Sequence, residues 1–149
     1  MDSAPPVPDS TRRRVAVGLV AVAAVTVLYW AAWFGHRSLV ASVHTSAYYQ
    51  FENAFPVADG WLIVCLVGAA VTLWAHRPVA LFWLLAGGGA GLYLFAMDSL
   101  YDIEHGIWGK GGNGLVELGI NIVTLILSLA VLRWAWVRRH PLLLGSIPV

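Results

Sequence analysis

The stretch Leu115–Val137, LVELGINIVTLILSLAVLRWAWV, determines the fold predicted for this chain. It is apolar and long enough to cross a membrane as a helix. Polar side chains recur along it at helical spacing, at Glu117, Asn121, Thr124 and Ser128. That spacing places them on one helix face, which lipid solvates poorly and which must therefore point toward other helices. The stretch thus predicts a membrane-spanning helix that belongs to a bundle.

Three further apolar runs precede this stretch, at about residues 15–34, 56–75 and 78–97. Each is about 20 residues long, the length that a helix needs to cross a hydrocarbon core of roughly 30 Å. The third run has the sequence of a helix that continues past Met97 toward His105. Because the chain is 59% hydrophobic and only 11% charged, a soluble domain would lack the polar surface to stay in solution. We therefore predict an all-α integral membrane protein, built as a four-helix bundle.

Basic residues indicate which side of the membrane each end of the chain occupies. They concentrate before the first run, between the second and third, and at the end of the last, which is typical of cytoplasmic segments. We predict two cytoplasmic tails, residues 1–14, disordered, and 138–149, around one transmembrane domain, 15–137. Arginine outnumbers lysine, and Ala, Gly and Val are abundant, as in GC-rich bacterial genomes, so the predicted location is a bacterial plasma membrane. The basic residues assigned to the cytoplasm are Arg12, Arg13, Arg14, Arg77, Arg133, Arg138 and Arg139.

The first outer loop, from His36 to Phe55, has apolar residues close to helical spacing. We predict an interfacial helix in this loop. Its aromatic side, which includes Tyr48, would rest on the mouth of the bundle, and Glu52 would lie partly toward water.

The stretch from Met97 to Asn121 contains four of the eight acidic residues of the chain. Asp98, Asp102 and His105 are spaced by four and three positions, so they share one face if the helix continues beyond Met97. This end of the bundle is therefore the predicted functional site.

Among the possible functions of this site, the residues favour acid/base chemistry on a lipophilic molecule. At the membrane edge, burial and neighbouring carboxylates favour neutral carboxylic acids, which can exchange protons with a substrate. The polar face of the last helix would orient a molecule that enters from the bilayer. The candidate catalytic residues are Glu117, Asp98, Asp102, His105 and Asp59. The candidate substrate-binding residues are Asn121, Thr124, Ser128, Tyr101, Tyr48, Glu52 and Trp108.

In size, number of spans and use of carboxylates in a membrane cavity, the chain is similar to small four-span sterol isomerases and related sterol-binding proteins. No motif matches residue by residue, so the similarity is one of architecture. It implies an isomerase- or cyclase-like enzyme.

A divalent metal site on Asp98, Asp102 and His105 is an alternative, but this spacing is not a recognised ligand pattern. We therefore predict neither a metal nor a cofactor. Because Cys65 is the single cysteine, the chain can form neither an intramolecular disulfide nor a thiolate cluster.

Three other interpretations of the acidic stretch stay open. It can be a solvated helix end without function, part of a proton- or cation-coupled transporter or channel, or part of a structural subunit of a larger membrane complex. The predicted partners are a membrane lipid or lipophilic small molecule, together with a second copy of the chain or a larger complex. The topology excludes nucleic acid.

Overall fold

The computed structural model describes residues 6–144, and every element in that range is a helix. The long helices are α1 (Asp9–Val40), α3 (Phe55–Trp74), α4 (Ala80–His105) and α5 (Gly111–Val137). The short elements are α2 (Ser46–Glu52), the 3-10 turn η1 (Ile107–Gly109) and α6 (Arg139–Leu144).

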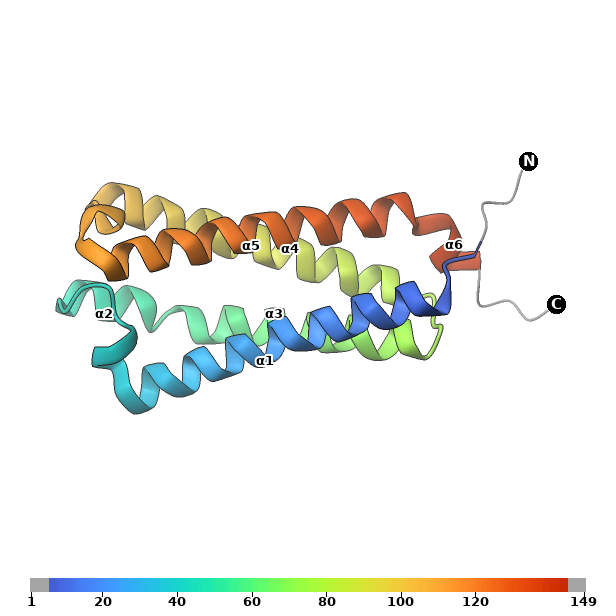
Figure 1. Cartoon of the computed structure of the whole chain (residues 1–149), viewed down its shortest axis with the longest axis horizontal. Coiled ribbons are helices and arrows are strands. Elements are labelled where there is room, and N and C mark those ends of the chain that lie inside the picture. Colours follow the sequence, from blue (N-terminus) through green and yellow to red (C-terminus); the bar gives the residue numbers. More distant parts are fainter. Residues whose placement is uncertain (1–5, 145–149) are drawn as a thin grey trace.

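The four long helices run alternately up and down in a bundle (Figure 1). α1 packs on α3, α3 on α4, and α4 on α5. α2 and η1 lie at one end of this bundle, which we call the α2 end, while α6 lies at the other end. The predicted all-α four-helix bundle is confirmed.

The outer surface of the bundle is apolar. Each of the four long helices contains an apolar window long enough to cross a membrane, and most residues of each window are not buried inside the protein. Large side chains such as Val25, Leu28 and Ile126 are more than half exposed. This surface suits lipid rather than water, so the chain is a multi-pass membrane protein.

The helix ends differ from the predicted bounds at both tails and in the first loop. α1 begins at Asp9, inside the segment predicted to be disordered, and the Arg12 side chain donates to the Val7 carbonyl at 3.3 Å. α1 also runs past the apolar run to Val40, with a kink at His36. The predicted interfacial helix is therefore the short α2. Residues 1–5 and 145–149 of the predicted tails lie outside the described range.

The core at the end opposite α2 is closed by aliphatic side chains. Leu73, Leu84 and Ala135 are at most 1% exposed. Glycines on α4 allow close packing there, since a Cβ added at Gly88 would lie 2.6 Å from Leu132 Cγ. The buried acidic side chains of the described residues, Glu52, Asp102 and Glu117, all lie at the α2 end.

Gly114 lies near the start of α5 and packs closely against the backbone of η1, and its substitution tests this packing. A Cβ at Gly114 would overlap the Ile107 carbonyl oxygen of η1, whereas one at Gly112 meets nothing within 4 Å. We expect Gly114→Ala to lower the free energy of unfolding by about 1–3 kcal/mol, because backbone must move. Gly112→Ala is the matched control, and melting in detergent is the measurement. Equal melting temperatures for both variants would contradict the packing described for η1.

Candidate functional site: a carboxyl cluster at the α2 end

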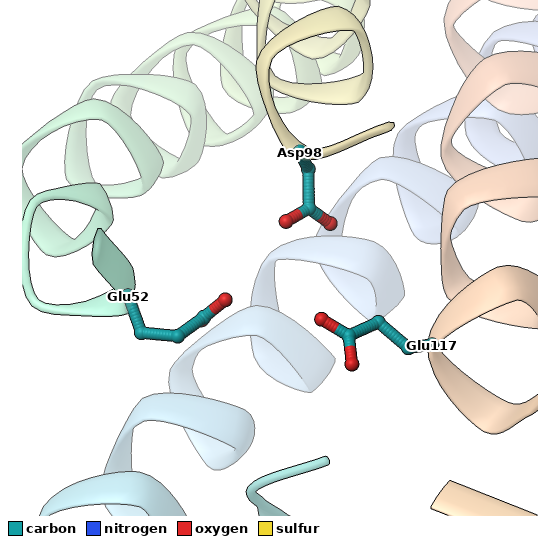
Figure 2. Close-up of side chains that lie close together, drawn as sticks. All are labelled: Glu52, Asp98 and Glu117. Atoms are coloured by element: carbon teal, nitrogen blue, oxygen red, sulfur yellow. The ribbon is translucent and has the colours of Figure 1, made fainter. Parts of the chain in front are cut away.

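Three carboxyl groups from three different helices meet at the α2 end. They belong to Glu52 of α2, Asp98 of α4 and Glu117 of α5, and one oxygen of each lies within 4.8 Å of the other two. All three side chains point into the same space (Figure 2). We call these three residues the carboxyl cluster.

The local structure of α2 explains how Glu52 reaches the interior. Thr45 caps this helix by accepting a hydrogen bond from the Tyr48 backbone N–H at 3.3 Å. Residues 48 and 52 are one helical turn apart, so they share a face, and both are buried. The structure thus places Glu52 inside the bundle end rather than partly toward water.

Two tyrosine hydroxyls donate to the carboxyl cluster. Tyr48 Oη donates to Glu117 Oε1 at 3.1 Å, and Tyr29 Oη of α1 donates to Glu52 Oε2 at 3.5 Å. Helices α1, α2, α4 and α5 therefore all contribute groups to this one site.

Asp102 lies beside the carboxyl cluster and is completely buried. Its Oδ2 accepts two hydrogen bonds of 2.8 Å, from Trp108 Nε1 and from Asn121 Nδ2. Its carboxyl group lies beside the Glu117 carboxyl group. Asp102 Oδ1 and Glu117 Oε2 are nevertheless buried without a donor. These two oxygens are buried acceptors whose hydrogen-bonding capacity is unused within the described residues.

The basic side chain of α1 at this end of the bundle, Arg37, lies against aromatic rings rather than in an ion pair with a carboxyl group. Arg37 lies over the rings of Trp33 and Tyr49, 5.2 and 5.0 Å from their centroids. Within residues 6–144, no Lys or Arg forms an ion pair with Glu52, Asp59, Asp98, Asp102 or Glu117. The negative charge that this site can carry is thus not compensated by basic side chains in the described range.

The remaining candidate residues lie around this centre or outside it. Asp59 accepts a hydrogen bond of 2.8 Å from Trp30 Nε1, which ties α3 to α1. His105 is exposed, and its Nδ1 contacts the Tyr101 carbonyl oxygen at 2.9 Å. The Tyr101 ring stacks on Phe51 with 3.8 Å between centroids. His105 therefore does not point into the carboxyl cluster.

The polar face of α5 lies inside the bundle. Asn121 and Ser128 are buried, and Thr124 is half-buried. Asn121 serves Asp102, whereas Ser128 packs against Gly91 of α4, where an added Cβ would overlap its Oγ. The part of this face nearer the α2 end thus belongs to the site, and the part farther from that end belongs to helix packing.

Sequence reasoning missed the central place of Glu52 and the donors on α1, Tyr29 and Trp30. The one-turn spacing of Tyr48 and Glu52 was the available signal, because it gives α2 one polar and aromatic inner face. Tyr29 and Trp30 resemble membrane-interface aromatics in sequence, and only the packing of α1 shows their partners.

The chemistry of the carboxyl cluster suits a hard cation, because carboxylate oxygens are the ligands that such ions prefer. The residues that could hold one are Glu52, Asp98 and Glu117, not the Asp98, Asp102 and His105 set considered from the sequence. Comparison of the chain with known protein families, curated proteins and solved structures finds no match.

Proposed function

We propose that this chain is a small cation-coupled membrane protein whose carboxyl cluster is the cation site. The observation that carries the proposal is the gathering of five carboxyl groups, three of them buried and two partly buried, at one end of a membrane bundle without a basic partner in the described residues.

Electrostatics require that something compensate these groups. Two carboxylates about 5 Å apart repel by about 3 kcal/mol at an effective dielectric constant near 20. Removing each charge from water costs several kcal/mol more. Charges on Glu52, Asp98 and Glu117 together would therefore cost much of the stability of a small domain. A bound cation removes this cost and is held by the same carboxylates.

The position of the carboxyl cluster links cation binding to the arrangement of the helices. Glu52 lies on the short α2, whereas Asp98 and Glu117 lie on long helices. A cation between them draws α2 onto the bundle, and its release frees α2 to move. Such a link between occupancy and conformation is what a proton- or cation-coupled transporter needs. The closed aliphatic core beyond Ser128 means that transport requires the helices to rearrange.

A small cation suits the space at the site better than a lipophilic substrate does. The cation needs only the gap between carboxylate oxygens, whereas a lipophilic molecule needs a cavity beside them. One groove of the described residues, with a volume of about 330 Å³, lies between α3 and α4. Its lining contains none of the five carboxyl groups: Ala58, Trp61, Ala86, Ala90, Tyr93 and Leu94.

Acid/base catalysis on a lipophilic molecule is the second candidate, and the buried polar face of α5 favours it. Asn121 and Thr124 lead from the carboxyl cluster toward mid-membrane, where they would orient a substrate. Native mass spectrometry of the detergent-purified protein separates the two candidates. A small lipophilic molecule retained by the wild type and lost in Asn121→Leu would favour the enzyme over the cation-coupled protein.

Melting of the purified protein in detergent tests the proposed function. Starting from choline chloride buffer, Na⁺, Mg²⁺, Ca²⁺ or Mn²⁺ is added, or the pH is lowered. We expect at least one of these cations, the proton included, to raise the melting temperature by about 5–10 °C near saturation. The Glu104→Gln variant, which loses an exposed carboxylate of α4, should respond as the wild type does. If no cation raised the melting temperature, the proposed function would be wrong.

A further inference from the structure

We propose that Glu52, Asp98 and Glu117 bind one divalent, oxygen-preferring cation of the size of Ca²⁺. This inference rests on the proposed function and narrows its cation to one chemical class.

The spacing of the oxygens fits an ion of that size. Ca²⁺ binds oxygens at about 2.3–2.6 Å, so two of its ligands can be up to roughly 5 Å apart. The three carboxylate oxygens of the carboxyl cluster lie within 4.8 Å of one another. Mg²⁺ binds at about 2.0–2.1 Å, which brings even opposite ligands to roughly 4.2 Å. An ion equidistant from three oxygens at the 4.8 Å limit lies about 2.8 Å from each, a distance closer to that of Ca²⁺ than to that of Mg²⁺.

Glu117 also carries a buried carboxyl oxygen that has no hydrogen-bond donor. Glu117 is only 7% exposed, its Oε2 has no hydrogen-bond partner, and its carboxyl group points toward the other two. A buried acceptor without a donor costs about 1–3 kcal/mol or more when charged. A cation coordinated by the Glu117 carboxyl group can bind this oxygen, for which no donor is found among the described residues.

The surroundings hold the ligands in place, as outer partners do in metal sites. Tyr48 donates to the other oxygen of Glu117 and fixes its orientation. Next to Glu117, the Asp102 carboxylate is fixed by Trp108 and Asn121. Asp102 adds a further negative charge close to the cation, which strengthens binding of a divalent over a monovalent ion.

The ligand types exclude the softer metals. The carboxyl cluster contains carboxylates alone, whereas zinc and copper prefer histidine or cysteine ligands. His105 is turned away, and Cys65 is on α3, whose residues contribute no ligand to the carboxyl cluster.

Isothermal titration calorimetry of the detergent-purified full chain with CaCl₂ tests the inference. We expect one Ca²⁺ per chain, with Mg²⁺ bound at least tenfold more weakly. Glu52→Gln, Asp98→Asn and Glu117→Gln should each weaken Ca²⁺ binding by at least about tenfold, since each removes a ligand charge. Tyr48→Phe should weaken it by a smaller factor. Glu104→Gln, an exposed carboxylate on the same helix as Asp98, should bind as the wild type does.

Two controls show whether a loss of Ca²⁺ binding comes from the site itself: melting of the variants without cation, and Ca²⁺ binding by Glu104→Gln. The amide variants remove buried charge, so in cation-free buffer they should melt at or above the wild-type temperature, which shows that they fold. Saturable Ca²⁺ binding that is lost in the three variants and kept in Glu104→Gln supports the site. Absence of saturable Ca²⁺ binding, equal binding by the variants, or Mg²⁺ binding as tight as Ca²⁺ binding would overturn it. If only Na⁺ or protons stabilised the protein, this inference would fail while the proposed function stood.

Discussion

Glu117→Gln is expected to fold and yet lose much of the stabilisation that cations give to the wild type. Glu117 is the cluster member with a free buried oxygen, and it lies next to both Asp98 and Asp102. At a cation concentration of 100 times the dissociation constant, binding stabilises the wild type by about 2.7 kcal/mol. A tenfold loss of affinity would leave the variant about 1.4 kcal/mol of this, and a larger loss would leave less. The measurement is the melting temperature in detergent with and without the cation.

The order of sensitivity among the carboxyl variants is part of this prediction. Asp98→Asn and Asp102→Asn should follow Glu117→Gln in severity, because Asp98 is a proposed ligand and Asp102 lies beside the proposed ligand Glu117. Glu104→Gln should be mild, since Glu104 is exposed. A Glu104→Gln variant more damaged than Glu117→Gln would move the site from the interior of the bundle to its surface.

Trp33→Ala is expected to cause the largest loss of stability of any single substitution considered, about 3–5 kcal/mol. Trp33 is 0% exposed and packs against Trp30 and Tyr48, while its Nε1 donates to Asn53 Oδ1 at 3.0 Å. Its removal leaves a cavity under α2 and breaks the link from α1 to the segment after α2.

Trp61→Ala is the matched control, because Trp61 is 49% exposed on the apolar surface. Denaturant unfolding in detergent should show a small effect for Trp61→Ala and a large one for Trp33→Ala. Cation affinity should also fall in Trp33→Ala, because α2 carries Glu52. Similar unfolding of both variants would show that packing of Trp33 against Tyr48 does not hold α2 on the bundle.

The four-helix bundle could be predicted from the sequence because its determinants are local. A span is recognised from the length and apolarity of one run, and the inward face of α5 follows from the spacing of Glu117, Asn121 and Ser128. No knowledge of the neighbouring helices is needed for either conclusion.

The carboxyl cluster could be predicted only in part, because it depends on contacts between distant segments. Asp98 and Glu117 adjoin the same turn in the sequence, and their proximity follows from the antiparallel pairing of α4 and α5. Glu52 comes from α2, and its burial depends on how Tyr48 and Trp33 pack that helix onto the bundle. His105 was placed with Asp98 by spacing alone, but α4 ends at His105, and its ring packs on Tyr101 outside the site.

Infrared difference spectroscopy between cation-free and cation-saturated protein tests most directly whether the carboxyl cluster binds the cation. Cation binding should change the carboxyl and carboxylate stretching bands, because the groups that hold the ion change their protonation or coordination. We expect Glu52→Gln, Asp98→Asn and Glu117→Gln each to remove part of this difference signal, and Glu104→Gln to leave it intact. A difference spectrum without carboxyl bands, or one that the three cluster variants leave unchanged, would contradict it.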